Sequence, residues 1–253
     1  MIDTHSHLYA EEFDHDRDAM LARAKQAGIE RIYMPAIDSA THQGLMALAQ
    51  SHPDYCIPMM GLHPCYVDAS MEKELQVVQE WLETTPFAAI GEVGLDFYHS
   101  IEFKDLQVEA FGRQIEMAIS FDLPLVIHSR SSMDECIKMI ATKGQGKVKG
   151  IFHCFGGDMR QAQRILELGF LLGIGGVVTY KNAGLAGIVE TLPLESFVLE
   201  TDAPYLSPVP YRGKRNETAY MTEVAQKMAS IKGVDLTVVS EITTANAKKI
   251  FRF

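Results

Sequence analysis

Positive charge is scarce in this sequence. Its 253 residues contain 23 Lys and Arg against 33 Asp and Glu, which gives a formal net charge of −10. Proteins that coat duplex DNA are usually basic, because contacts to phosphate drive their binding. The charge balance therefore excludes a protein that coats duplex DNA. Binding of nucleic acid would require a local basic pocket.

Long apolar runs and paired cysteines are also missing. No stretch of about 18 apolar residues occurs, so we expect no transmembrane helix and no membrane partner. The opening residues MIDTHSHLYAEEFD carry neither a basic stretch nor an apolar core, so we expect no signal peptide. The four cysteines form no CxxC pair, which predicts reduced thiols in a cytoplasmic protein.

What the chain does contain is a regular alternation of short apolar runs and amphipathic stretches. The runs predict strands, and helical patterns lie between and after them. The predicted strands are 1–7, 31–37, 57–63, 88–94, 124–129, 150–155, 170–176 and 197–202. The predicted helices are 14–27, 39–51, 72–84, 103–121, 132–142, 158–168, 183–191, 217–231 and 235–250.

Eight strand–helix units in a chain of this length favour a single-domain (β/α)8 TIM barrel over residues 1–253, within the α/β class. A doubly wound open sheet is the alternative. That fold usually has a Gly-rich turn after its first strand, and here the segment reads DTHSHLY. The barrel places the active site at the carboxyl ends of the strands.

Titratable residues gather at these strand ends. Five of the nine histidines and three carboxylates lie there: His5, His7, His63, His128, His153, Glu92, Glu200 and Asp202. A single histidine of this kind is usually a hydrogen-bonded core residue. Eight such groups at one barrel mouth would be costly unless they were paired or bound to metal.

The mixed ligand set is large enough for two divalent ions, with Zn, Mn, Ni and Mg as candidates. We expect the first ion on His5, His7 and Asp202 and the second on His128 and His153, with Glu92 as the bridge.

Seven motifs then follow the same order as in a known family. They are DTHSHL, GLHP, GEVGLDFY, PLVIHSR, HCFGG, LETDAPYL and RNE. Together they resemble the TatD family of metal-dependent deoxyribonucleases, within the amidohydrolase-like barrels. The resemblance implies a TIM barrel, a two-metal centre and hydrolysis of DNA phosphodiesters. It places metal ligands on the same six positions and active-site roles on His63 and Glu200.

The chain departs from the family pattern at two places. Thr218 follows RNE where the family often has Pro, and Ser131 and Ser132 follow Arg130 where Asp-Ala is frequent. These differences concern loop shape and substrate preference.

Two metals can clamp the attacking and leaving oxygens of a phosphoryl displacement. We hypothesise that a metal-bridging hydroxide attacks phosphorus and that Asp202 accepts a proton from the water. Glu200 is expected either to relay a proton or to orient a ligand by hydrogen bonding. Asp202, Glu200 and His63 are the catalytic candidates.

Binding of a phosphate requires donors. His63 and Arg130 are expected to contact it, the latter in bidentate fashion. Lys181, Arg212, Lys214 and Arg215 form a basic cluster in loops, where a solvated surface is the commoner outcome. Arg215, which belongs to the RNE motif, is the candidate of the four, unless it only braces its loop through Glu217.

For residues next to these candidates, a structural role is expected more often than a catalytic one. Asp96 is expected to order the loop after the fourth strand. Phe97, Tyr98 and Tyr205 could stack on bases, although packing among loops is the commoner role. Cys154 follows His153 directly, so strand alternation predicts that its thiol points toward the helices.

Three functions stay open. The first is a deoxyribonuclease acting on strand ends or single strands of DNA. The second is a hydrolase of a C–N, ester or lactone bond in a small molecule; such relatives often bridge their metals with a modified Lys, and the run AAIGEVG has Glu92 instead. The third is an inactive barrel that only binds.

Overall fold

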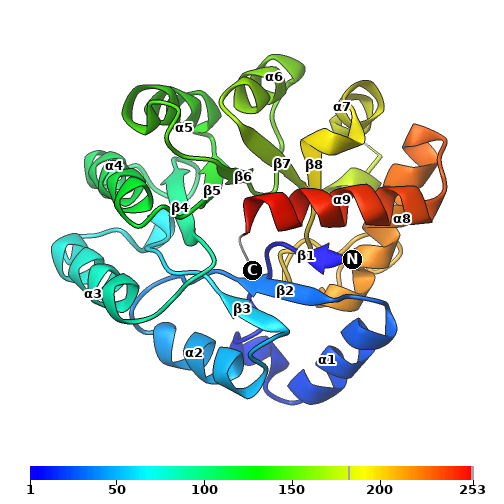
Figure 1. The fold of residues 1–253 in the computed structure, drawn as a ribbon, viewed down its shortest axis with the longest axis horizontal. Helices are drawn as coiled ribbons and strands as arrows, with labels where there is room; N and C mark the ends of the chain where they lie inside the picture. The colour runs from blue at the N-terminus through cyan, green and yellow to red at the C-terminus, as the bar shows by residue number, and fades with distance from the viewer. Residues whose placement is uncertain (182, 252–253) are drawn as a thin grey trace.

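The computed structural model describes residues 1–181 and 183–251, and Figure 1 shows its strands surrounded by helices. Eight parallel strands lie in the described part of the chain. They are β1 (Ile2–Asp3), β2 (Arg31–Met34), β3 (Cys56–Pro58), β4 (Ile90–Asp96), β5 (Leu125–Arg130), β6 (Gly150–Phe152), β7 (Phe170–Ile174) and β8 (Phe197–Leu199).

Helices follow the strands along the chain. The α-helices are α1 (Arg17–Gln26), α2 (His42–Ser51), α3 (Met71–Thr84), α4 (Lys104–Ser120), α5 (Met133–Met139), α6 (Met159–Glu167), α7 (Leu185–Thr191), α8 (Met221–Lys232) and α9 (Leu236–Ile250). A π-helical turn (Ile140–Gly144) extends α5, and short 3-10 turns include Pro64–Tyr66 and Thr218–Tyr220. None of the described helices combines the length and apolar character needed to cross a membrane.

Backbone pairing closes the strands into a barrel. Regular hydrogen bonding joins β1, β2 and β3 in one arc and β4 to β8 in another. Single parallel bridges, Met60 with Ile90 and Ser6 with Ala203, connect the two arcs. The predicted TIM barrel is therefore confirmed, and the open sheet is excluded.

Several strands are shorter than predicted. The first ends at Asp3 and the last at Leu199, so His5 and Asp202 belong to the segments that follow the strands. Those segments still pair through the backbone: Asp202 N–H donates to His5 O at 2.9 Å. The polar residues thus extend the barrel wall beyond its regular ladder.

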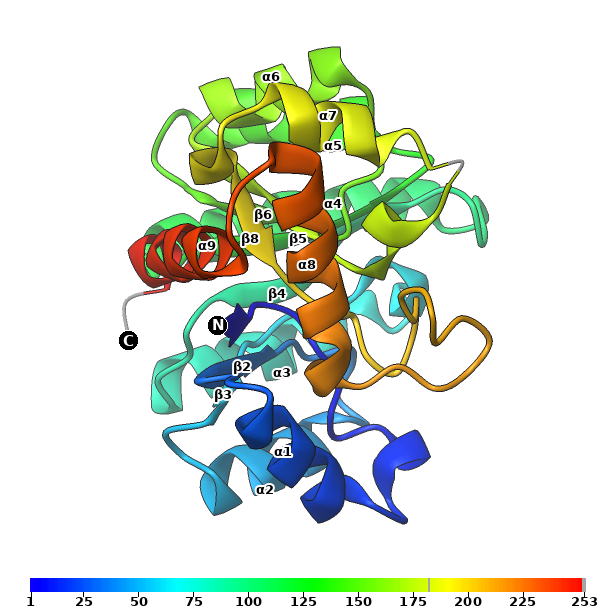
Figure 2. The ribbon, with the colours of Figure 1, turned by 90° about the vertical axis from the view of Figure 1, so that its right-hand side faces the viewer.

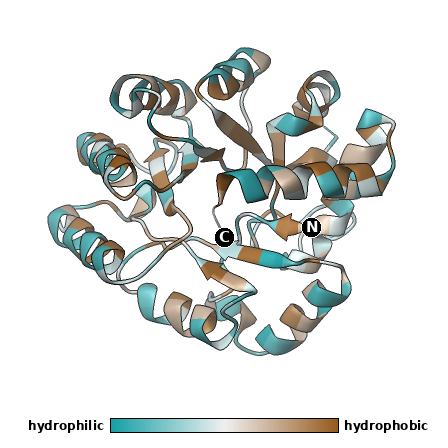
Figure 3. Cartoon of the chain, viewed as in Figure 1, coloured by the Kyte–Doolittle hydropathy of each residue, from teal (hydrophilic) through white to brown (hydrophobic). Residues whose placement is uncertain are grey.

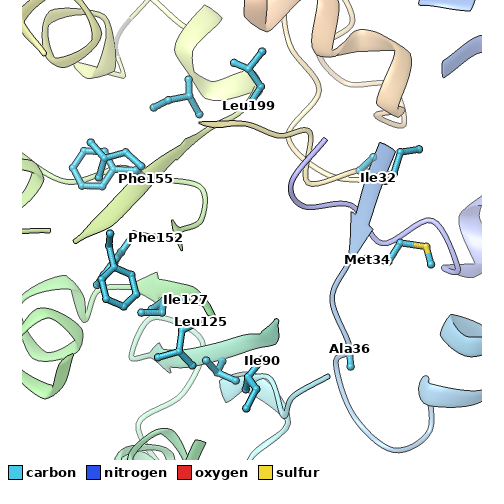
Figure 4. Packing of buried hydrophobic residues seen from close by; sticks show 14 of the residues in the cluster. Ile32, Met34, Ala36, Ile90, Leu125, Ile127, Phe152, Phe155 and Leu199 are labelled. Carbon is cyan, nitrogen blue, oxygen red and sulfur yellow. The ribbon is translucent and has the colours of Figure 1, made fainter. Parts of the chain in front are cut away.

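The strands are apolar on both faces because helices cover one face and the barrel interior the other. Leu125, Ile127 and Phe152 pack in the large cluster that includes the helices, and Figure 4 shows this layer. Figure 3 shows the helices alternating hydrophobic and hydrophilic residues around their axes. Val126 and Ile151 face inward, where a second apolar cluster fills the barrel.

We call this second cluster the barrel floor. It closes the amino-terminal end of the barrel beneath the end of α9, which Figure 2 shows on the side opposite the loop that follows β8. Phe251 stacks on Tyr33 with ring centroids 3.8 Å apart. The floor consists of Ile2, Tyr33, Ile57, Met59, Ala88, Ala89, Val126, Ile151, Val198, Ala247, Ile250 and Phe251.

Candidate metal centre

The polar cluster lies directly above the floor because strand residues two apart share a face. His128 follows Val126 by two positions, His153 follows Ile151, and Glu200 follows Val198. The same inward face therefore changes from apolar to ionisable within one step along three strands.

Glu92 in β4 stands at the centre of the cluster and is buried. Its carboxylate oxygens lie between 2.8 and 3.4 Å from ring nitrogens of five histidines. The five are His5, His7, His63, His128 and His153. Glu92 is the residue that we expected to bridge two ions. In the structure it contacts both expected groups of histidine ligands, His5 with His7 and His128 with His153.

The first half gathers at Oε2 of Glu92. His5 Nε2 lies 3.0 Å from this oxygen and His7 Nε2 lies 3.4 Å from it, while the two nitrogens are 3.3 Å apart. Bonds of about 2.0–2.1 Å to one tetrahedral ion would separate such ligand atoms by about 3.3–3.4 Å. Asp202 Oδ1 lies 3.8 and 3.6 Å from the same two nitrogens. The donor atoms therefore have the chemistry and spacing of a cation site.

The second half gathers at Oε1. His128 Nδ1 lies 2.8 Å away, His153 Nε2 3.2 Å and His63 Nε2 3.4 Å. The ring of His153 also stacks on that of His5 at 3.7 Å, which brings the halves into contact.

Three of these histidines have their second ring nitrogen against an oxygen atom. Nδ1 of His7 lies 3.1 Å from the Tyr9 hydroxyl, which itself donates to Pro35 O. Nε2 of His128 lies 2.9 Å from Asp96 Oδ2, and Nδ1 of His153 lies 3.2 Å from Glu200 Oε1. The contacts of His7 and His128 are hydrogen bonds of the kind that metal-ligating histidines make, because the outer acceptor fixes the tautomer that leaves a lone pair for the ion. The contact of His153 is a charge contact without hydrogen-bond geometry.

The ring of His63 is oriented differently, with a hydrogen-bond acceptor on its outer nitrogen and a donor toward Glu92. Its Nδ1 accepts the Cys65 backbone N–H at 3.1 Å, so the neutral ring carries its proton on Nε2, the atom that faces Glu92. Burial lowers the pKa of His63, which favours this neutral form. His63 therefore presents an N–H donor to the centre, whereas the outer partners of His7 and His128 leave these two rings with lone pairs toward it.

Charges in the centre depend on one another. Burial by itself would raise the pKa of Glu92, but the surrounding histidines, led by His5 and His63, hold it well below its ordinary value. Burial and the nearby His153 lower the pKa of His5. Burial raises the pKa of Asp202 to about 6, although His153 and His7 oppose this. The protein thus keeps one ionised carboxylate among the imidazoles and a second, more basic one beside it.

Two glycines permit this crowding. Gly94 has a φ of +135°, and a Cβ there would overlap the backbone carbonyl of His128 on the neighbouring strand. A Cβ on Gly173 would overlap the Glu200 carboxylate. Small residues at these positions let β5 and the Glu200 side chain approach the centre.

A cavity of about 1380 Å³ opens over the cluster. Its lining includes His7, His63, Glu92, His128, His153, Asp202 and Arg130. Glu200 is fully buried beneath it. Arg130 is exposed and stacks on Tyr98, with its guanidinium carbon 3.9 Å from the ring centroid.

Arg215 lies elsewhere and is absent from the described lining of the cavity. Its guanidinium binds Asp16 at 2.7 and 2.9 Å and donates to Glu12 O at 2.6 Å. Glu217 is 3.9 Å away. The arginine braces the loop after β8 through Asp16 more than through Glu217.

The expectation for Cys154 was wrong. β6 ends at Phe152 and Cys154 has a φ of +46°, so strand alternation stops before it and the residue lines the cavity. The prediction for Asp96 agrees with the structure, since Oδ1 accepts N–H bonds from Tyr98 and His99 in the loop. Its contact with His128 was missed, although the spacing Glu92-x-x-x-Asp96 in a strand could have suggested it.

A barrel whose mouth holds clustered imidazole and carboxylate donors defines the class of metal-binding α/β-barrel proteins. The family model described as TatD related DNase matches residues 2–252. The chain therefore belongs to the TatD family of metal-dependent hydrolases.

Individual relatives agree with this assignment. The chain is 36% identical over 253 residues to the uncharacterized metal-dependent hydrolase YabD of Bacillus subtilis, covering 100% of this chain and 99% of the relative. It is 32% identical over 259 residues to the 3′-5′ ssDNA/RNA exonuclease TatD of Pectobacterium parmentieri, covering 100% and 99%. The crystal structure of YjjV, a TatD homologue from Escherichia coli K12, superposes with a TM-score of 0.93 at 29% identity, covering 100% and 98%.

Proposed function

We propose that this chain is a divalent-metal-dependent deoxyribonuclease that cleaves phosphodiester bonds at the ends of DNA strands. The name of the Pectobacterium relative supports an exonuclease, and its single-stranded substrates are the starting point for this chain. The cavity of about 1380 Å³ exceeds the roughly 300–1,000 Å³ of typical small-molecule pockets, which favours the end of a polymer.

The proposal assigns two divalent ions to the centre, with Zn, Mn, Ni and Mg as candidates. One set of ligands is His5, His7 and Asp202, the other is His128 and His153, and Glu92 is shared. The observation that carries this assignment is that each oxygen of Glu92 faces its own group of imidazoles. When bound there, a pair of divalent ions would supply charge stabilisation for the attacking and leaving oxygens and would lower the pKa of water.

The chain's own residues supply the remaining steps. Asp202, whose pKa burial raises to about 6, accepts a proton from the attacking water. His63 donates its Nε2–H to a non-bridging phosphate oxygen. Glu200 holds His153 in position through Nδ1. Arg130, at the cavity edge, binds a phosphate of the strand.

We also propose that residues 1–253 act as a single unit in the cytoplasm. The barrel takes strands from Ile2 to Leu199, and the described helices pack around it. The four cysteines are free thiols, which agrees with a reducing compartment.

The test is incubation of the purified protein with 5′-labelled single-stranded and 3′-overhang DNA, in Mg²⁺, in Mn²⁺ and in EDTA. We expect progressive shortening that requires metal, and no shortening by Glu92→Ala. DNA binding in EDTA should be weak, given the net charge of −10.

A panel of lactones, amides and phosphate esters runs in parallel. Turnover of a lactone or amide without metal-dependent DNA cleavage would replace this proposal with the small-molecule hydrolase. A protein that retains no metal and turns over neither class would be a binding barrel. Tight DNA binding in EDTA would contradict a role for the ions in holding the phosphate.

A further inference from the structure

A second group of ligand-type side chains lies at the edge of the same cavity, outside the set of five histidines. It comprises Cys65, Asp96 and His99, whose candidate ligand atoms all lie within 4.8 Å of one another. Cys65 comes from the short helix Pro64–Tyr66, Asp96 ends β4, and His99 lies in the loop after it. Cys65 and His99 line the cavity together with Glu92 and Asp202.

The distances in this group suit a tetrahedral ion. Sγ of Cys65 lies 3.5 Å from Nδ1 of His99. With a Zn–S bond of about 2.3 Å and a Zn–N bond of about 2.0 Å, tetrahedral angles place sulfur and nitrogen about 3.5 Å apart. Asp96 Oδ2 lies 2.8 Å from the same nitrogen as a hydrogen-bond partner. A slightly longer distance between Asp96 Oδ2 and His99 Nδ1 would make room for an ion that all three side chains bind.

The surrounding structure holds Asp96 in place for such a role. Its Oδ1 accepts the N–H groups of Tyr98 and His99, both at 2.9 Å, and its backbone N–H donates to Gln107. Oδ2 is the oxygen turned toward His99 and toward Nε2 of His128, 2.9 Å away. One oxygen thus orders the loop, and the other faces the cluster.

The thiol also bears on the choice of ion. Cys65 is exposed to the cavity, but partial desolvation by its neighbours raises the pKa of its thiol to about 12, and the nearby Asp96 carboxylate adds to this effect. The thiol is therefore protonated at neutral pH, and an adjacent divalent cation is what would release its proton to solvent as the metal–sulfur bond forms. Thiolate, imidazole and carboxylate together favour zinc over magnesium.

We propose that Cys65, Asp96 and His99 bind a third divalent cation of the zinc type, with its fourth coordination position open to the cavity. Three protein ligands and one open position are the arrangement of zinc sites that contact substrate. The open position takes an anionic oxygen, and if the proposed nuclease function holds, that oxygen belongs to a phosphate beside the scissile one. Asp96 then connects this ion to His128 of the main centre.

The experiment titrates Co²⁺ into metal-free full-length protein kept reduced with a phosphine. Co²⁺ bound to thiolate has a sulfur-to-metal charge-transfer band in the near ultraviolet, and the main centre offers imidazole and carboxylate only. We expect this band in the wild type, together with one more bound equivalent than in Cys65→Ser. Cys65→Ser should lack the band. His99→Gln should require on the order of tenfold more Co²⁺ or more, since even outer partners of ligands cost about 10–100-fold in affinity.

Cys154→Ser is the matched control, because Cys154 is the other cavity-lining cysteine and should leave the band intact. Cys65 and His99 are exposed, so their variants should fold, which thermal melting checks. A wild type without the band, a band that survives Cys65→Ser, or a band that Cys154→Ser removes would overturn the proposal. The readout uses no substrate, so its failure is distinct from failure to cleave DNA.

Discussion

The floor and the mouth of this barrel are built on the same strands. At the floor, Tyr33 and Phe251 stack among aliphatic side chains and α9 closes the end. At the mouth, one step further along the inward face, Glu92 lies among five imidazoles beneath an open cavity. The floor cluster consists of apolar side chains and Tyr33, whereas the centre of the mouth consists of a carboxylate and imidazoles.

This difference shows how one fold separates stability from chemistry. Burying apolar surface at the floor stabilises the barrel by about 25 cal/mol per Å². Gathering buried charges at the mouth costs free energy unless partners or ions compensate. Substitutions at the two ends should therefore affect different measurements.

Glu92→Ala should have the largest effect at the mouth. Losing the carboxylate that both ligand groups share should lower metal content and reduce activity by at least about 1000-fold, equivalent to ~4 kcal/mol. Metal analysis and DNA cleavage measure the two losses. A variant that keeps both metal and full turnover would contradict the shared role of Glu92.

Phe251→Ala is the corresponding change at the floor. Removing a buried aromatic ring should lower the free energy of unfolding by about 3–5 kcal/mol. Turnover per folded molecule and metal content should stay unchanged, which separates it from Glu92→Ala. Denaturant unfolding followed by circular dichroism is the measurement. Equal loss of metal in both variants would show that the two ends are coupled.

Glu200→Gln tests the boundary between the two ends. Its carboxylate accepts the Cys154 N–H at 2.5 Å and lies against Nδ1 of His153. An amide of the same size should weaken metal binding by about 10–100-fold while leaving the fold intact. Competition with a chromophoric chelator gives the affinity. An unchanged affinity would leave Glu200 with a purely structural role.

Arg215→Ala should affect stability and spare catalysis, because Arg215 is bound to Asp16. The loss should be about 1–2 kcal/mol at neutral pH, for a bidentate pair with partial exposure. Hydrogen bonds from Arg215 and then Arg23 hold the pKa of Asp16 well below the ordinary range of an aspartate. That stabilisation is present above about pH 4 and is lost as Asp16 is protonated in more acid solution.

Unfolding curves at several pH values measure this effect. The difference between wild type and Arg215→Ala should shrink as the pH falls below 4. A difference that is independent of pH would show that the Asp16 pair is not its source. A raised KM for DNA would restore Arg215 as a substrate contact.

Arg130→Ala should give the smallest effect and the opposite pattern. Arg130 is exposed at the cavity edge, so its removal should raise KM for DNA by about tenfold, or ~1.4 kcal/mol, with unfolding unchanged within about 0.5 kcal/mol. Steady-state cleavage at varied DNA concentration measures it, with Arg215→Ala as the matched arginine control.

Much of the site followed from local sequence. Apolar runs ending in His or Glu predicted both the barrel and which residues meet at its mouth, since parallel strands bring their carboxyl ends together. The predicted strands were too long at His5 and Asp202 because composition does not mark where a ladder gives way to irregular pairing. Cys154 was misplaced for the same reason: its positive φ breaks the alternation that the prediction assumed.

The order of apolar and ionisable residues along each strand determined the fold class and the set of groups at the mouth, because strand periodicity acts over a few neighbouring residues. The seven ordered motifs carried the resemblance to the family. Only the tertiary structure decided which groups touch. In the folded chain Arg215 binds Asp16, and the Nε2–H of His63 faces Glu92. Cys65 lies close to Asp96 and His99. These contacts join residues distant in the chain or depend on loop geometry, which no local pattern specifies.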